Sequence, residues 1–308
     1  MTELQRYLAE EIAIDHADGL IARREAVRRL LLLGLSASSA AALLAACARE
    51  NPPTTPPPSK VTPGPGTPGH AVTTPVSPVP TEAIEFPGPG GRSLGGAWAP
   101  ARTRPEGVSG SVLVIHENRG LNDHIRSVAG RLAASGYPAL AIDLLSEEGG
   151  TGAFSDPARA TAALGRIPQE RLVAAMKAGL SELEDRIGSS KLAAMGFCFG
   201  GGMVWSLLAS GETRLAAAVP FYGPLPEGAD LSGSKAAVLA IYAELDTRVN
   251  ATREAARQAL ERVRLPHEII TFPGADHAFF NDTGPRYSAG AANDAYQRVL
   301  SWFKRYLG

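Results

Sequence analysis

The sequence is poor in cysteine and has almost no net charge. Its 308 residues contain two cysteines, Cys47 and Cys198, so it has neither a disulfide framework nor a cysteine cluster for zinc. The formal net charge is −1 and no basic stripe follows residue 60, which argues against nucleic acid as a partner. No internal repeat is found. What is present is an ordinary globular composition, 44% hydrophobic and 20% charged, in a chain long enough to bury a substantial core.

The first 47 residues have the pattern of an export signal. Four arginines precede an apolar, small-residue run over residues 30–46. These arginines are Arg23, Arg24, Arg28 and Arg29. The pair at 23–24 upstream of a mild, Ala-rich run resembles a twin-arginine signal, which exports folded proteins, although Ala26 and Val27 stand where Phe and Leu are commoner.

The apolar run ends in Leu-Ala-Ala-Cys at Cys47. This ending resembles a bacterial lipobox, in which the cysteine becomes the lipidated N-terminus of the mature protein. We therefore expect an exported protein, lipid-anchored in the bacterial cell envelope, whose only membrane contact is the lipid. The alternatives are an uncleaved membrane anchor, for which a run of about 17 residues is barely long enough, and an amphipathic helix packed on the domain.

Residues 48–82 are rich in Pro, Thr and Gly. Such a segment cannot bury a core and favours extended, polyproline-like chain. It is therefore predicted to be a solvated linker, and residues 83–308 are predicted to form the single folded domain.

Apolar, β-rich runs alternate with helical patterns through this domain. The expected strands cover residues 111–117, 137–144, 191–197, 215–223, 236–246 and 267–274. The expected helices lie around residues 122–135, 157–187, 199–211, 250–264 and 288–307. Near-continuous apolar strands separated by helices predict an α/β fold, a mostly parallel sheet with helices on both faces. Ligands bind outside the carboxyl ends of such strands, so the chemistry should follow each strand directly.

One strand end carries a Gly-x-Cys-x-Gly pattern centred on Cys198. The pentapeptide GFCFG, residues 196–200, follows an apolar run and precedes a helical pattern, which is the context of a nucleophile elbow. The glycines make room for a sharp turn, and the positive helix N-terminus favours a thiolate. The alternative is a structural cysteine, because free cysteine is often buried as a small hydrophobe.

Two residues further along favour the catalytic interpretation. The α/β-hydrolase fold places nucleophile, acid and histidine in that chain order. Asp246 ends an expected strand, and His277 lies just beyond the last one. The imidazole would take the thiol proton and the carboxylate would fix its tautomer. Glu244 and Asp276 compete with Asp246 for the acid role.

Together these motifs resemble the dienelactone hydrolase family. The cysteine at the elbow, the strand-end HENRGL (116–121), the order Cys198–Asp246–His277 and the segment HAFFNDTGPRY (277–287) carry the resemblance, which covers roughly residues 83–308. It implies an α/β-hydrolase fold and hydrolysis of an enol-lactone, carboxymethylenebutenolide, with no metal or organic cofactor.

The resemblance also implies roles for three residues near the first strand and the elbow. Glu117 corresponds to the glutamate that contacts the thiol and helps to activate it, whereas the alternative is an ion pair with Arg119 or Arg126. The backbone N–H groups of Phe199 and Asn118 would form the oxyanion hole.

The sequence departs from the family at one substrate-binding position. Well-studied members hold the substrate carboxylate with arginines, one of them four residues after the histidine, where this chain has Asn281. Arg286 and Tyr287, with Asn281, are candidate substrate-binding residues, and Arg159 or Arg166 are further candidates. The departure keeps two alternatives open: a broad carboxylesterase, and a non-catalytic binding lipoprotein with a hydrolase fold.

Overall fold

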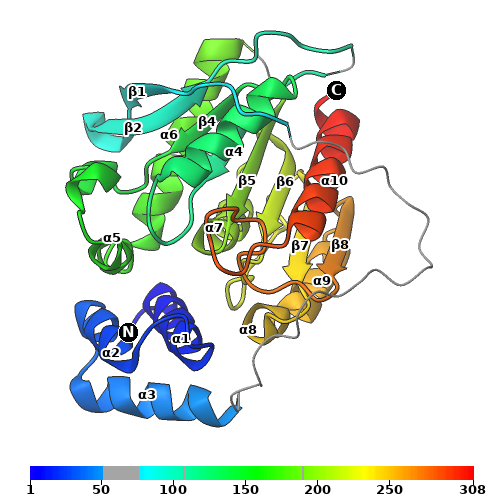
Figure 1. The fold of residues 1–308 in the computed structure, drawn as a ribbon. Coiled ribbons are helices and arrows are strands. Elements are labelled where there is room, and N and C mark those ends of the chain that lie inside the picture. The colour runs from blue at the N-terminus through cyan, green and yellow to red at the C-terminus, as the bar shows by residue number, and fades with distance from the viewer. Residues whose placement is uncertain (51–75, 107, 189–190) are drawn as a thin grey trace. The chain divides into compact units, whose positions relative to one another are not determined.

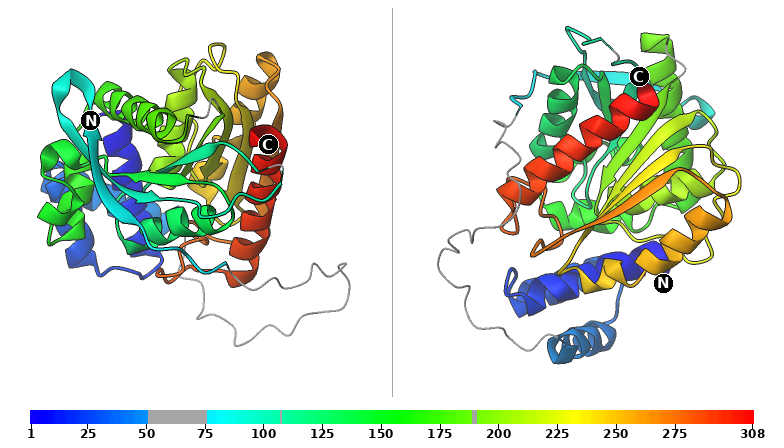
Figure 2. Two further views of the ribbon diagram at one scale, coloured as in Figure 1. Left: turned by 90° about the horizontal axis from the view of Figure 1, so that it is seen from above. Right: turned by 90° about the vertical axis from the view of Figure 1, so that its right-hand side faces the viewer.

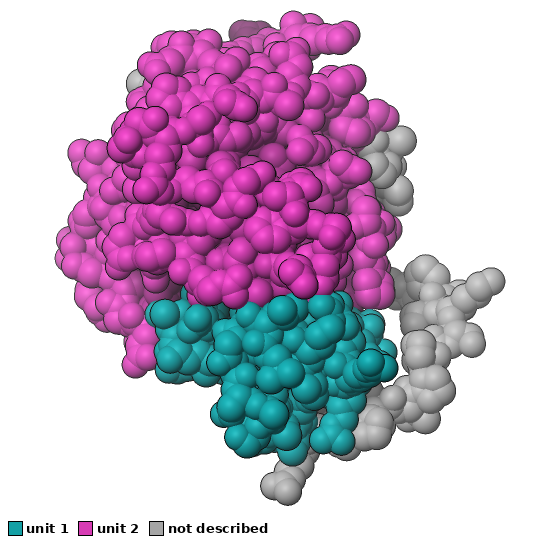
Figure 3. Space-filling view, turned by 90° about the vertical axis from the view of Figure 1, so that its left-hand side faces the viewer, with its two compact units in different colours: residues 1–75 teal, residues 76–308 magenta. Residues whose placement is uncertain are grey.

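The computed structural model describes residues 1–50, 76–106, 108–188 and 191–308 (Figure 1). The chain divides into two compact units, residues 1–75 and 76–308 (Figure 3). Most of the predicted linker, residues 51–75, lies outside the described residues.

The first unit contains three helices that pack on one another, α1 (Glu3–Ala17), α2 (Arg23–Leu32) and α3 (Ala37–Glu50). The arginine pair opens α2, and the apolar run predicted as one segment is divided by a turn between α2 and α3, with Cys47 on α3. Hydrogen bonds from Arg28 and Arg29 lower the pKa of Glu25 to about 2, so two of the four arginines of the predicted export signal are paired with a carboxylate. Among the helices described, none has the length and apolar character needed to cross a membrane.

The second unit is built on an eight-stranded sheet in the order β1-β2-β4-β3-β5-β6-β7-β8. The strands are β1 (Glu82–Pro87), β2 (Ser93–Ala99), β3 (Ser111–Ile115), β4 (Ala139–Ile142), β5 (Leu192–Phe197), β6 (Leu215–Phe221), β7 (Ala237–Ala243) and β8 (His267–Phe272). β1 and β2 pair antiparallel with their neighbours, and all the other pairs are parallel. The predicted fold class, a mostly parallel sheet in an α/β domain, is therefore confirmed.

Helices cover both faces of this sheet (Figures 1 and 2). α4 (Asp123–Ala134) and α10 (Ala289–Leu307) pack on one face, and α6 (Gln169–Ile187) and α7 (Phe199–Ala209) pack on the other. The remaining helical segments are η1 (Pro89–Gly91), η2 (Ser146–Glu148), η3 (Thr151–Ala153), α5 (Pro157–Leu164), α8 (Thr247–Asn250) and α9 (Arg253–Arg262). β3, β4, β5 and β7 are buried along their whole length, which explains their near-continuous apolar sequences.

Two features differ from the sequence prediction. The strands β1 and β2 were not expected, because their Pro and Gly content weakens the local strand signal; pairing of β2 with β4 supplies the missing stabilisation. The single helix expected over 157–187 is two helices, α5 and α6, because Pro168 cannot continue a helix and instead stands at the N-cap of α6.

Candidate active site

Cys198 occupies a strained turn between β5 and α7. Its backbone has φ 56° and ψ −120°, a region that side-chain-bearing residues rarely adopt. The Cys198 N–H donates to the Phe221 carbonyl on β6 at 3.0 Å, so the turn is tied to the neighbouring strand. Cys198 is 2% exposed. Strained backbone at a cysteine that directly follows a strand is typical of a nucleophile elbow and is not expected of a structural cysteine in the core.

The glycines on either side of Cys198 are required by close backbone contacts. A Cβ added at Gly196 would lie 2.2 Å from the Gly200 carbonyl oxygen. A Cβ at Gly200 would lie 2.4 Å from the carbonyl oxygen of Ile115 and 2.5 Å from that of His116, at the end of β3. The first turn of α7 therefore packs directly on the end of β3, and this brings Cys198 beside the segment that follows β3.

Asp246 and His277 meet at the carboxyl ends of β7 and β8. His277 Nδ1 donates to Asp246 Oδ2 at 2.5 Å, and the other Asp246 oxygen accepts the Val249 N–H at 3.1 Å as the N-cap of α8. The two rival acids have other partners: Glu244 accepts the Gly274 N–H at 2.7 Å, and Asp276 accepts the backbone N–H of His277 at 2.6 Å. Of the three carboxylates, Asp246 is the one that holds the imidazole.

The charges of this pair shift both of its pKa values. Burial favours neutral Asp246, but the charge and hydrogen bond of His277 outweigh burial and lower the pKa of Asp246. Burial also opposes an imidazolium, yet the charges of Asp246 and Cys198 and the hydrogen bonds to both raise the pKa of His277 well above its usual value. A His277 ring nitrogen lies within 4.8 Å of the Cys198 sulfur. The three side chains thus form one electrostatic unit that favours a charged imidazolium.

The His277–Asp246 pair makes folding stability depend on pH. Asp246 has a lowered pKa, so its contribution is present above about pH 4, its unfolded value. His277 has a raised pKa, so its contribution is complete below about pH 6.5 and is lost as pH rises through the folded value. We expect Asp246→Asn to lower the free energy of unfolding by about 3 kcal/mol near pH 6 and by less at alkaline pH. Urea unfolding of both proteins across pH measures this; a difference that grows with pH contradicts it.

Glu117 and Asn281 join the segment after β3 to the segment that carries His277. The Asn281 side-chain N–H donates to Glu117 Oε2 at 2.7 Å, and Glu117 is buried. Asn281, predicted as a candidate for binding substrate, is thus engaged with the carboxylate predicted to act on the thiol.

Hydrogen bonds from other elements hold the segment after β3 that carries Asn118, whose N–H is a predicted oxyanion-hole donor. The Thr161 hydroxyl on α5 donates to the Asn118 carbonyl at 2.9 Å. His116 is a structural residue: its Nε2 accepts the Leu144 N–H at 3.1 Å and its Nδ1 lies 2.6 Å from the Glu117 carbonyl oxygen. Burial lowers the pKa of His116, which fits a neutral ring with an accepting Nε2. The N–H of Phe199 lies at the start of α7, where helix N–H groups lack intrahelical partners.

The other candidate substrate-binding residues lie in different surroundings. Arg286 Nε is 3.2 Å from Asp276 Oδ2, so this arginine braces the segment around His277. Tyr287 is 40% exposed, and Arg159 and Arg166 are exposed on and just after α5. Arg286 therefore pairs with Asp276 in this structure, and a role for it in binding the substrate carboxylate is supported by the sequence alone.

Sequence reasoning missed Tyr222. This residue follows β6, has a positive φ of 34°, and packs edge-on against the His277 ring with centroids 5.1 Å apart. Its N–H donates to the Ile241 carbonyl at 2.7 Å. The sequence signal was its position at the carboxyl end of the expected strand 215–223, the edge of a parallel sheet where ligands bind.

The fold and this arrangement define an α/β-hydrolase: a mostly parallel sheet, a sharp Gly-x-Cys-x-Gly turn after β5, a carboxylate after β7 and a histidine after β8. The family model of the dienelactone hydrolase family matches residues 101–307. The chain belongs to the dienelactone hydrolase family, and it is a hydrolase acting on ester bonds.

Named relatives agree with this family. A protein of Escherichia coli O157:H7, provisionally named carboxymethylenebutenolidase, is 32% identical over 79% of this chain and 90% of its own length. A crystal structure from Klebsiella pneumoniae, provisionally named dienelactone hydrolase, is 31% identical and covers 73% of this chain and 99% of its own, with a TM-score of 0.63. A promiscuous phosphotriesterase from metagenomic libraries, described as dienelactone hydrolase-like, is 26% identical over 74% of this chain and 98% of its own, with a TM-score of 0.57.

Proposed function

We propose that the protein hydrolyses enol-lactones or small esters through a Cys198–His277–Asp246 triad and an acyl-enzyme. The observation that carries the proposal is the buried Asp246–His277 hydrogen bond of 2.5 Å, with the imidazole beside a cysteine at a strained strand-to-helix turn. The raised pKa of His277 supports an imidazolium paired with a Cys198 thiolate.

In the first step the Cys198 sulfur forms a bond to the carbonyl carbon and the carbonyl electrons move onto oxygen. The backbone N–H groups of Phe199 and Asn118 donate to this oxyanion. Its collapse breaks the carbon–oxygen bond to the leaving group, which takes the His277 proton and leaves the imidazole neutral. Water then loses a proton to His277 and attacks the thioester; the carbon–sulfur bond breaks, releasing the acid and restoring thiolate and imidazolium.

Esters with good leaving groups fit this site better than amides. A tetrahedral thiol adduct expels whichever group leaves more readily, and an enolate or aryl oxide leaves readily whereas an amine does not. The provisional names of the relatives support a lactone. The hydrogen bond from Asn281 to Glu117 favours a second candidate, a broad carboxylesterase. In the family this position binds a substrate carboxylate through an arginine, whereas here its amide is bonded to a carboxylate of the protein.

Steady-state rates on a dienelactone and on a series of aryl acetates separate these candidates. The lactone hydrolase predicts a higher kcat/KM for the lactone than for any aryl acetate. Good turnover of aryl acetates with none of the lactone supports the carboxylesterase. No turnover of either, together with a Cys198 that iodoacetamide alkylates no faster than free cysteine near neutral pH, supports the non-catalytic lipoprotein.

We also propose that the protein is exported by a twin-arginine signal and lipidated at Cys47. The arginine pair, the apolar run and the Leu-Ala-Ala-Cys ending support this. If Cys47 carries lipid, the chain has no second cysteine with which Cys198 could form a disulfide, so Cys198 would persist as a thiol outside the cytoplasm.

Mass spectrometry of the envelope fraction of a bacterium expressing the full chain tests the export proposal. The expected N-terminal peptide begins at lipid-modified Cys47, and Cys47→Ser is expected to leave the precursor unprocessed. Protein with an intact Met1 in the envelope contradicts the proposal.

A further inference from the structure

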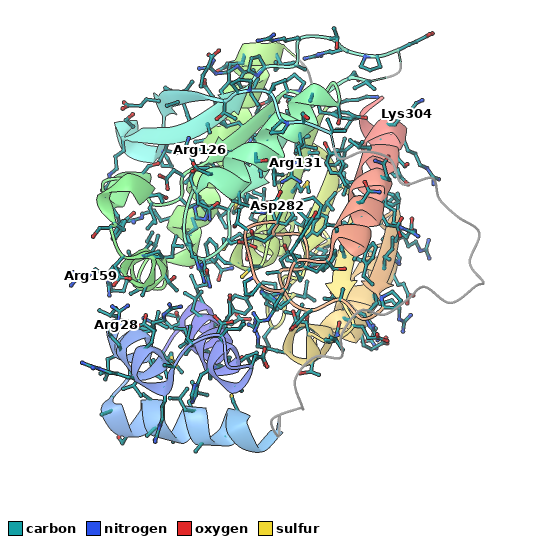
Figure 4. All side chains as sticks on the ribbon, viewed as in Figure 1. Arg28, Arg126, Arg131, Arg159, Asp282 and Lys304 are labelled. Carbon is teal, nitrogen blue, oxygen red and sulfur yellow. The ribbon has the colours of Figure 1, made fainter. Side chains whose placement is uncertain are left out.

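Outside the proposed triad, a second buried histidine binds a carboxylate of the same segment that carries His277. His124, on the first turn of α4, places Nδ1 2.8 Å from Asp282 Oδ1, and Arg131, two turns along α4, places Nη2 3.1 Å from Asp282 Oδ2. Figure 4 labels Arg131 and Asp282, which come from α4 and from the loop before α10. Because a carboxylate only accepts, His124 Nδ1 and Arg131 are the donors. We call these three residues the α4 clasp.

The His124 end of the α4 clasp is buried, and burial of its polar atoms costs free energy. The His124 side chain is 1% exposed and lies edge-on to the rings of Phe197 and Phe280, and Arg131 stacks on the Phe280 ring at 5.6 Å. Within the described residues, His124 Nε2 and Arg131 Nε have no hydrogen-bond partner. A buried polar group left half-satisfied contributes less to stability than an apolar side chain of the same shape. Stability alone therefore does not account for this histidine.

The position of Asp282 gives the clasp a consequence at the site. Asp282 directly follows Asn281, whose amide donates to Glu117, and α4 follows the loop that carries Glu117 and Asn118. The same two segments are therefore joined at two adjacent residues: Glu117 contacts Asn281, and His124 and Arg131 contact Asp282. The second contact fixes the backbone beside Asn281 and limits where its amide can point.

We propose that His124 and Asp282 are positioning residues, which hold the Asn281 amide on the Glu117 carboxylate and thereby set the reactivity of Cys198. The proposal rests on the proposed function for the chemistry of the thiol, and on the family resemblance for the action of Glu117 on it; Glu117 lies in the segment after β3, on whose end Gly200 packs. The clasp acts through Asn281, so removing Asp282 and removing the Asn281 amide have the same consequence for Cys198.

A double-mutant cycle on the full-length protein tests this path. The rate of iodoacetamide alkylation at Cys198, read from the Cys198 peptide so that Cys47 does not interfere, is measured for wild type, Asp282→Ala, Asn281→Ala and the double variant. Each single variant is expected to change the rate roughly tenfold in the same direction, and the double variant no more than either alone. Effects that multiply to roughly a hundredfold, or an Asp282→Ala protein with the wild-type rate, overturn the proposal.

Substitutions of His124 separate positioning from packing. Asn places an amide N–H where the histidine has Nδ1–H, so His124→Asn is expected to keep the wild-type alkylation rate, whereas His124→Leu matches Asp282→Ala. If both His124 variants change the alkylation rate by the same factor, the His124–Asp282 hydrogen bond is not the cause. Asp294→Asn, which breaks an exposed ion pair with Arg298 on α10, is the matched control and leaves the rate unchanged.

One measurement does not need a reactive thiol. Deuterium uptake of the peptide that spans residues 277–288 is expected to rise in Asp282→Ala and to stay at the wild-type level in Asp294→Asn. Unchanged uptake in Asp282→Ala overturns the clasp. If Cys198 of the wild-type protein is unreactive and the protein hydrolyses no ester, the proposed function is wrong. The deuterium-uptake result alone then tests the α4 clasp.

Discussion

Replacing Cys198 by alanine is expected to lower kcat/KM on aryl acetates by at least about a thousandfold. Alanine removes the atom that forms the thioester and leaves only the backbone donors and binding to assist attack by water. Cys198→Ser retains a nucleophile, but a serine hydroxyl has to give up its proton during attack, so we expect about a hundredfold loss on the same esters. Initial rates with p-nitrophenyl acetate, corrected for spontaneous hydrolysis, measure both.

The chain supplies its own control for this experiment. Cys47 is the other cysteine, on α3 in the first unit, and Cys47→Ser is expected to keep the wild-type rate. Full activity in Cys198→Ala would mean that the esterase chemistry uses a different nucleophile.

Gly200→Ala is expected to lower the free energy of unfolding by about 3 kcal/mol or to prevent folding. Its Cβ would lie 2.4 Å from the Ile115 carbonyl oxygen, and that atom belongs to a strand in the middle of the sheet. Neither the backbone of β3 nor the first turn of α7 can move without disturbing the Cys198 turn. Urea unfolding followed by circular dichroism measures the loss.

Gly202→Ala is the matched control on the same helix. Its Cβ would lie 3.6 Å from the nearest atoms of Pro224, an ordinary contact, and alanine favours helix over glycine by up to about 1 kcal/mol. We therefore expect Gly202→Ala to leave stability unchanged or slightly higher. Equal destabilisation by the two substitutions would show that the close approach of α7 to β3 is not what requires Gly200.

The sequence predicted the parts of the fold that have strong local signals. β3, β5 and β7 are wholly buried, so their apolar runs are continuous and were found, and the fold class followed from their alternation with helices. β1 and β2 could not be predicted because their own residues favour strands only weakly; pairing of β1 with β2 and of β2 with β4 stabilises them. Pro168 was visible in the sequence, yet the helical pattern on both sides of it concealed the break between α5 and α6.

For the candidate site, the sequence indicates which residues lie at strand ends, but not which of their side chains form hydrogen bonds with one another. Strand ends pointed to Cys198, Asp246 and His277, since parallel strands bring their carboxyl ends to one edge. Which of Asp246, Glu244 and Asp276 meets the imidazole depends on the path of two loops, and that path is visible only in the structure. The same holds for the bond from Asn281 to Glu117, between residues 164 positions apart in the chain.

Rapid-quench mass spectrometry of the protein reacting with p-nitrophenyl acetate tests the central claim most directly. The proposed mechanism predicts an acetyl group on the Cys198 peptide within the first turnover, absent from the Cys47 peptide, and decaying at the rate of steady-state turnover. Turnover with no acetylated Cys198, or with the acetyl group on another residue, would contradict the assignment of Cys198 as the nucleophile.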